Sequence, residues 1–176
     1  MTLKRGLATL GPVMQLAWLP SDFDAAVRHW TQVMGVGPFF LLEDIQLEDS
    51  RYLGAPNECL FSIALAYWGD LQVELIRQQN DAPSIYRDVA GQGLHHTCLI
   101  TDDIAAARKI AEAAGASLLV EGKVGADGAV IYLDTGGGPG TIVEVLQPAT
   151  GMMDLFAMIR EASQDWDGSE PLRRLG

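Results

Sequence analysis

The sequence predicts an α+β protein in which two paired βαβββ modules form a curved mixed sheet around a cleft. Three observations support this fold class. A short apolar run followed by a capped amphipathic helix occurs twice, over residues 13–34 and over residues 94–114. Each helix is followed by three β-rich runs, and the last run of each half carries one glutamate between apolar residues, Glu74 or Glu144. Such self-similarity indicates two copies of one supersecondary unit.

The first module opens with a strand and a helix. Residues 13–19 form a short apolar run, and Pro20, Ser21 and Asp22 end it with residue types that break strands and cap helices. From residue 22 to residue 34 apolar side chains recur at steps of three and four, and Gly35 follows where a helix commonly ends. We therefore expect an amphipathic helix over residues 22–34.

The second module repeats this order. An apolar run over residues 94–100 precedes Asp103, and an alanine-rich helix over residues 104–114 ends at Gly115. Aligning the two helix starts gives an offset of 81 residues, which places Gln15 opposite His96 in the repeat. The last strands align at an offset of 70, so the second module is shorter by 11 residues.

The remaining strands follow each helix. Expected strands cover residues 38–42, 59–68 and 71–77 in the first half, and 117–121, 129–134 and 141–146 in the second. The glycines at 136–138 and 140 could be taken for a phosphate-binding loop. No Gly-Lys-Ser/Thr follows, however, and a strand comes next, so we interpret them as a hairpin turn.

Neither half can cover both faces of its own sheet, so we expect a single domain over residues 1–176. Module 1 covers about residues 12–77, a linker residues 78–92, and module 2 about residues 93–148. The C-terminal segment 149–176 holds an amphipathic helix over residues 152–162. The polar tail from Ser163 is expected to be mobile.

Composition limits the partners. The chain has 176 residues with 12 Lys and Arg against 23 Asp and Glu, a net charge of -11, which disfavours nucleic acid and anionic lipid. No apolar run approaches the roughly 20 residues of a membrane span, and no signal peptide is recognisable. Two cysteines, Cys59 and Cys98, cannot make a disulfide framework, which is typical of a cytoplasmic protein.

Four polar residues stand at equivalent strand positions of the two modules. The neighbours of Glu74 and of Glu144 are apolar and require a core, so each glutamate must point to the opposite face of its strand. Gln15 and His96 occupy the equivalent first strands. Together the four side chains offer two carboxylates, an imidazole and an amide oxygen, a set that neutralises a divalent cation. The alternative is that the glutamates face solvent and His96 is a hydrogen-bonded core histidine.

Three further residues with potential ligand atoms are interpreted as lying outside the ligand set. Cys98 lies two residues beyond His96, about 6.5–7 Å along a strand, so we interpret it as lining the cleft rather than as a ligand. His95 is expected to face away from His96, as a packing or hydrogen-bonding residue. His29 lies on the first helix, away from the cleft.

Over residues 12–148 this arrangement resembles the vicinal oxygen chelate superfamily, which includes glyoxalase I, methylmalonyl-CoA epimerase, extradiol dioxygenases and bleomycin-resistance proteins. The stretch 93–96, Gly-Leu-His-His, followed by two aspartates, looks most like the epimerase branch. The set Gln15, Glu74, His96 and Glu144 is instead similar to that of a glyoxalase I subgroup. Epimerases usually carry histidine at the position of Gln15, and commonly glutamine at that of Glu74.

The resemblance implies a divalent metal ion (Zn, Ni, Co, Mn or Mg) and a lyase or isomerase that moves a proton next to a carbonyl. Glu144 would be the base, with Glu74 as its partner and as a further ligand. The substrate would be a small, partly apolar molecule, and we expect a homodimer. No Arg or Lys cluster indicates a coenzyme A or glutathione pocket. A non-catalytic binding or resistance protein is the main alternative. An extradiol dioxygenase is disfavoured because the set offers one histidine where that iron site uses two.

Overall fold

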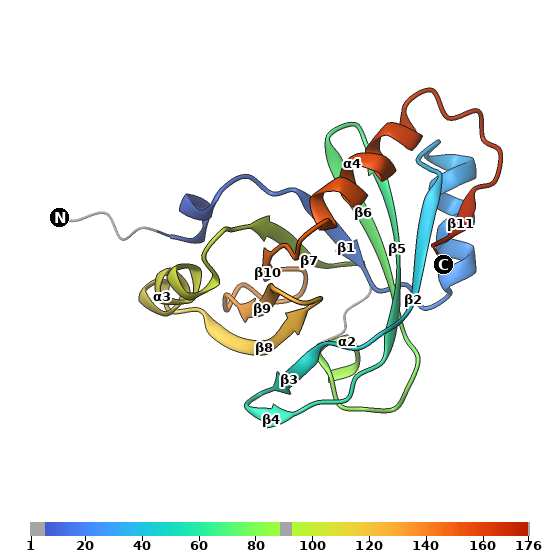
Figure 1. Ribbon diagram of the computed structural model, residues 1–176. Helices are drawn as coiled ribbons and strands as arrows, with labels where there is room; N and C mark the ends of the chain where they lie inside the picture. The colour runs from blue at the N-terminus through green and yellow to red at the C-terminus, as the bar shows by residue number, and fades with distance from the viewer. Residues whose placement is uncertain (1–5, 89–92, 176) are drawn as a thin grey trace.

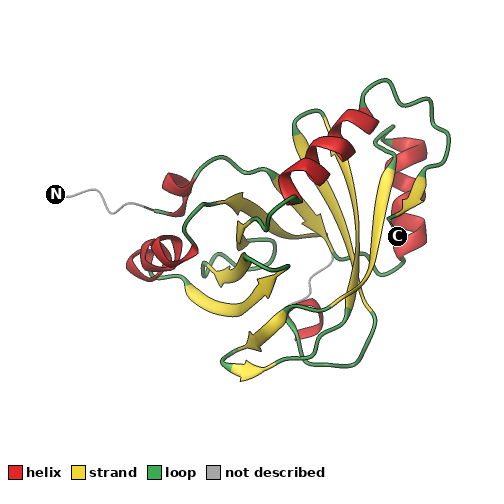
Figure 2. Cartoon of the chain, viewed as in Figure 1, coloured by secondary structure: helices red, strands yellow, loops and turns green. Residues whose placement is uncertain are grey.

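The computed structural model describes residues 6–88 and 93–175. Across these residues eleven strands join into one mixed sheet, in the order β11-β2-β5-β6-β1-β7-β10-β9-β8-β3-β4. The sheet curves strongly, and α1 and α3 lie at opposite outer sides of it (Figures 1 and 2). This arrangement confirms the predicted fold class.

Each module contains the helix and the four strands that the repeat predicted. In the first module these are β1 (Gln15–Trp18), α1 (Phe23–Arg28), β2 (Phe39–Ile45), β5 (Phe61–Trp68) and β6 (Leu71–Gln78). In the second they are β7 (Leu94–Ile100), α3 (Ile104–Ala114), β8 (Ser117–Val124), β9 (Gly128–Asp134) and β10 (Ile142–Gln147). The first strand and the last strand of each module run parallel, and β1 and β7 meet antiparallel at the junction.

The helix boundaries follow from their caps. The carboxylates of Asp22 and Asp103 accept hydrogen bonds from the backbone N–H of Ala25 and Ala106, which satisfies first-turn donors. Gly115 ends α3 with a φ of +87°, a conformation that glycine adopts without strain. The first helix is extended by a π-helical turn, η2 (His29–Val33), which replaces the final α-turn that the spacing predicted.

Alternation along the strands creates three apolar clusters. On the outer face of module 1, Phe23 and Val27 of α1 pack with Val73 and Leu75, and α3 packs in the same way on Val145 of module 2. A third cluster fills the concave side and includes Phe156 and Ile159 of α4 (Met152–Ser163). The concave face is therefore a covered interior rather than an open cleft.

The C-terminal tail differs from the expectation of a mobile segment. After α4 the chain forms β11 (Leu172–Arg174), which pairs parallel with β2. Without this pairing the backbone groups along one side of β2 would lack strand partners. The ring of Trp166 also lies on Gly37, where an added Cβ would come within 2.7 Å of it. The tail thus closes one edge of the sheet.

The segment predicted as a linker also has structure. Ser84, Ile85 and Tyr86 are buried, and the last two begin the short helix α2 (Ile85–Asp88). Residues 89–92, also assigned to the linker, lie outside the described residues. In the first module two strands were not predicted: β3 (Glu48–Tyr52) reaches across to pair with β8 of the second module, and β4 (Ala55–Pro56) pairs with β3. A short 3-10 turn, η1 (Leu7–Leu10), precedes β1. No helix among the described residues is long and apolar enough to cross a membrane.

Candidate metal centre

Strand register places the polar residues of the concave face in two neighbouring rows. Ala17 of β1 pairs with Glu74 of β6 on one side and with His96 of β7 on the other. The second row lies two residues further along the strands. There Gln15 pairs with Gln72 and with Cys98, and Cys98 pairs with Glu144 of β10. Directly paired residues point to the same face of a sheet. All four residues singled out in the sequence therefore lie on the concave face.

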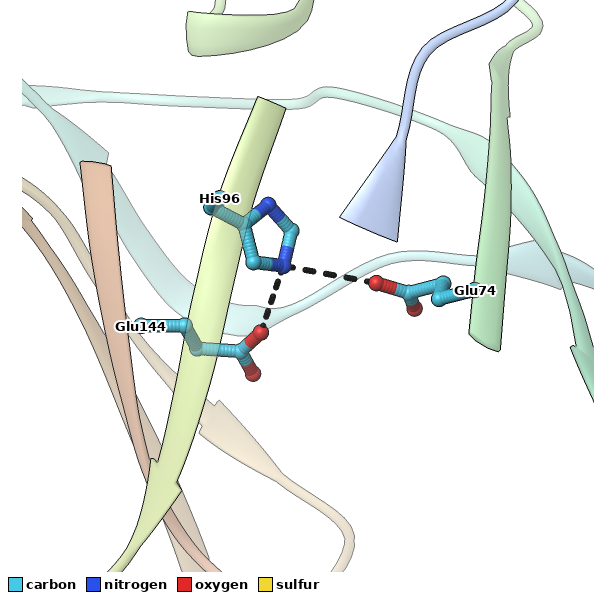
Figure 3. Close-up of side chains that lie close together, drawn as sticks. All are labelled: Glu74, His96 and Glu144. Carbon is cyan, nitrogen blue, oxygen red and sulfur yellow. Dashed lines mark ion pairs between the residues drawn. The ribbon is translucent and has the colours of Figure 1, made fainter. Parts of the chain in front are cut away.

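Three of these four side chains converge on one point. The Nε2 atom of His96 lies 2.9 Å from Oε2 of Glu144 and 3.4 Å from Oε2 of Glu74 (Figure 3). The ligand atoms of the three residues all lie within 4.8 Å of one another. Ala17 stands between Glu74 and His96 in the sheet, and its methyl group leaves the space in which the longer side chains meet.

The group is buried and incompletely hydrogen-bonded. His96 is 0% exposed, and the two glutamates are 6% and 7% exposed. Although carboxylate oxygens approach it, His96 Nε2 has no partner with hydrogen-bond geometry, and neither has Oε2 of Glu74. Two buried carboxylates around one imidazole nitrogen require a positive charge between them. Carboxylate and imidazole are suitable ligands for a divalent cation, so this set could hold one.

The pKa values of the metal-free protein also reflect the need for a positive charge between the two buried carboxylates. Burial by itself lowers the pKa of His96, but the contacts with Glu144 and Glu74 and their negative charges outweigh burial and raise that pKa to about 9. Burial also raises the pKa of Glu74, against the influence of His96. Without a metal ion, a proton on His96 supplies the positive charge.

The metal-free protein is expected to lose stability as the pH rises from 6.5 toward 9. Below the unfolded pKa of about 6.5, His96 carries its proton in the folded and the unfolded chain, and its stabilising contribution is complete. Above pH 6.5 His96 loses its proton in the unfolded chain before it does so in the folded one. The stabilisation from His96 therefore declines until the pH passes the folded-state pKa of about 9. Urea unfolding of chelator-treated protein should give a free energy about 1–2 kcal/mol lower at pH 8 than at pH 6.5. Metal-saturated protein serves as the control with a flatter profile, and a metal-free stability that rises over this interval would contradict the assignment.

Gln15 lies beside the cluster, in the same row of paired residues as Glu144. Its Nε2 donates a hydrogen bond to Oε1 of Gln72 at 2.6 Å, and Nε2 of Gln72 donates to the hydroxyl of Tyr67 at 3.2 Å. The amide nitrogen of Gln15 donates the first hydrogen bond of this series. Its amide oxygen is therefore the atom that remains to face a ligand. The structure thus brings together Glu74, His96 and Glu144 and places Gln15 next to them.

Of the residues assigned elsewhere, Cys98 and His29 lie as expected and His95 does not. Cys98 is buried between Gln15 and Glu144, and His29 is exposed on η2. His95 was expected to face away from His96, yet the Nδ1 atoms of the two rings lie 2.9 Å apart. The register between β1 and β7 explains this: Ala17 pairs with His96 but Trp18 pairs with Leu94, which leaves His95 as the extra residue of a bulge.

Two tyrosines that the sequence did not assign close the group from one side. The ring of Tyr132 meets His96 edge-on at 5.2 Å between centroids, and the ring of Tyr86 lies 5.6 Å from that of His95. Their hydroxyl oxygens are 3.4 Å apart, and burial raises the pKa of both well above the usual value. Tyr132 lies in the strand predicted over residues 129–134, but Tyr86 stands in the segment predicted as a linker, where no periodicity marks it.

A small cavity borders these tyrosines on the side of β3 and β4. Its volume is about 20 Å³, room for about one water molecule. It is lined mainly by apolar and hydroxyl-bearing side chains, among them Tyr52, Phe61, Ser84, Tyr86 and Tyr132. Glu144 pairs with Tyr132 across β10 and β9, so Tyr132 stands between this glutamate and the cavity.

Comparisons with known proteins agree with this architecture. A family model described as the Glyoxalase/Bleomycin resistance protein/Dioxygenase superfamily matches residues 14–133. No curated protein sequence matches the chain significantly.

Solved structures show the same fold at low sequence identity. Methylmalonyl-CoA epimerase from Mycobacterium tuberculosis is 16% identical with a TM-score of 0.55, and the match covers 87% of this chain and 97% of that one. A variant of the Streptomyces coelicolor methylmalonyl-CoA epimerase in complex with 2-nitronate-propionyl-CoA is 15% identical with a TM-score of 0.57, over 79% and 95% of the two chains. A hypothetical protein from Bacillus halodurans C-125 is 14% identical with a TM-score of 0.56, over 78% and 94%.

Proposed function

The chain belongs to the glyoxalase/bleomycin resistance protein/dioxygenase superfamily, and we propose that it is a divalent-metal-dependent lyase or isomerase that moves a proton on the carbon next to a carbonyl. The observation that carries the proposal is the buried convergence of Glu74, His96 and Glu144. These three side chains would hold the ion, with the amide oxygen of Gln15 as a fourth ligand. Zn, Ni, Co, Mn and Mg are the candidates for its identity. A bound divalent ion would polarise the substrate carbonyl and stabilise the negative charge that develops on its oxygen.

The carboxylates supply the proton-transfer group. We propose Glu144 as the base because it is directly paired with Tyr132, whose side chain forms part of the cavity wall, although neither glutamate lines the cavity itself. Glu74 is its partner on the opposite side of His96. The elevated pKa of Tyr86 and of Tyr132 keeps both hydroxyls protonated at neutral pH, so they can donate a hydrogen bond to a substrate oxygen.

The surroundings favour a small, partly apolar substrate. Phe61 and three tyrosine rings line the cavity together with aliphatic side chains, and the cavity has room for about one water molecule. The substrate therefore requires movement of the covering segments, and α2, which carries Tyr86, is the shortest of the helices that cover this side. Methylmalonyl-CoA epimerases among the structural relatives make acyl thioesters the first compounds to test.

A non-catalytic binding protein is the second candidate, because the superfamily description that matches this chain includes bleomycin resistance proteins. An extradiol dioxygenase receives no support, because that iron site requires a second histidine. The neighbouring His95 cannot supply it, since one ring nitrogen contacts His96 and the other contacts the backbone oxygen of Ile85.

Solvent isotope exchange separates the enzyme from the binding protein. Acyl thioesters and hemithioacetals incubated with metal-loaded protein in heavy water should gain deuterium at the α-carbon, even where net turnover is small. Mass spectrometry detects the incorporation, and heat-denatured protein with the same metal serves as the control. Tight binding of a compound without exchange anywhere in the panel would support the binding protein instead.

A further inference from the structure

We propose that His95 is a positioning residue for the metal centre: a hydrogen-bonded relay from the backbone oxygen of Ile85 through His95 aims the Nε2 lone pair of His96 at the space between Glu74 and Glu144. The inference rests on the proposed metal site and adds a residue that belongs to neither the ligand set nor the proton-transfer pair. It joins the centre to the segment between the two modules.

The bulge in β7 brings the two histidines together. In a regular strand consecutive side chains point to opposite faces, and His95 would lie against the outer core. The extra residue opposite β1 turns His95 inward, so its ring meets that of His96 edge-on at 5.2 Å between centroids. Both side chains are buried, at 2% and 0% exposure, so their ring nitrogens depend on protein partners.

The partners fix the position of each proton in the relay. The backbone oxygen of Ile85 only accepts, so Nε2 of His95, 3.0 Å away, must carry a proton and donate it. In a neutral imidazole the other nitrogen, Nδ1 of His95, is then an acceptor. It lies 2.9 Å from Nδ1 of His96, which must therefore be the protonated donor. This leaves Nε2 as the nitrogen of His96 that can present a lone pair.

When a metal ion replaces the extra proton that His96 carries in the metal-free protein, this lone pair would point where a ligand is needed. Nε2 of His96 is the atom that faces the carboxylates, at 2.9 Å and 3.4 Å. A histidine that ligates a metal is oriented and made more basic by the partner of its other nitrogen, and loss of such a partner typically weakens metal binding by 10–100-fold. Because Ile85 is fully buried and precedes Tyr86, the same relay holds the covering segment against the centre.

Substitution of His95 tests the relay through metal affinity rather than activity. In His95→Leu the acceptor for Nδ1 of His96 is lost, so Zn²⁺ affinity measured by calorimetric titration should fall 10–100-fold. His95→Gln keeps an amide oxygen as acceptor and an amide N–H as donor, so it should recover most of the affinity. His29→Gln, an exposed histidine on η2, is the matched control and should bind Zn²⁺ as the parent protein does.

Nitrogen-15 spectra of the imidazoles in the unsubstituted protein give an independent readout. In both the metal-free and the Zn²⁺-loaded protein, His95 should carry its proton on Nε2 and none on Nδ1. Failure of the parent protein to bind Zn²⁺ would overturn the metal site, whereas this tautomer in the metal-free protein tests the relay alone. Unchanged Zn²⁺ affinity in His95→Leu, or a proton on Nδ1 of His95, would overturn the relay.

Discussion

Glu144→Gln is expected to reduce α-proton exchange by roughly 10²–10⁴-fold while the protein still binds its metal ion. Glutamine retains an oxygen ligand and nearly the same volume, but it cannot accept the substrate proton. The substitution also removes one negative charge next to His96, so metal binding should weaken measurably without being abolished. Deuterium incorporation at saturating metal, with the metal content measured on the same sample, separates the two effects.

Glu74→Gln is the matched control, because this residue contacts the same nitrogen from the other side. It removes the same charge, so its metal affinity should weaken similarly while exchange falls much less. Loss of exchange in Glu74→Gln together with near-normal exchange in Glu144→Gln would reverse the roles assigned to the two carboxylates. Full activity of both variants would show that neither is the base.

His96→Leu should abolish metal binding and destabilise the metal-free protein by about 3–5 kcal/mol. Leucine leaves Glu74 and Glu144 buried without the imidazolium that balances them, and removal of one partner from a buried ionic group is strongly destabilising. Urea unfolding in the presence of chelator measures the loss. Adding Glu74→Gln to this variant removes one of the stranded charges and should recover part of the stability. A small loss of stability in His96→Leu, unaffected by the second change, would mean that the carboxylates do not depend on His96.

Strand alternation made most of the central site predictable from the sequence. Glu74 and Glu144 each stand between two residues that pack in the outer apolar clusters. Because β6 and β10 pair with β1 and β7 without a bulge, side chains alternate regularly and both glutamates point to the concave face. The repeat then identified His96 and Gln15 as residues of the same face. The end of α3 was equally predictable, because Asp103 and Gly115 are local signals whose effect does not depend on the rest of the fold.

Features that depend on pairing between distant segments were not predictable in the same way. The orientation of His95 follows from a bulge against β1, and a bulge is a property of two strands, not of the sequence around one residue. Tyr86 reaches the site because the non-periodic segment that forms α2 brings its ring against that of His95. The tail after α4 is polar and resembles a mobile terminus, yet the unpaired edge of β2 supplies the hydrogen bonds that order it.

Titration of the chelator-stripped protein with divalent ions tests the metal centre most directly. Calorimetry at neutral pH with Zn²⁺, Ni²⁺, Co²⁺, Mn²⁺ and Mg²⁺ should detect one bound ion per chain for at least one of these metals. The same ion should raise the unfolding temperature as its concentration exceeds the dissociation constant. The variant that combines Glu74→Gln with Glu144→Gln should lose this binding. Absence of binding for every ion, or equal binding by the double variant, would contradict a metal centre built on Glu74, His96 and Glu144.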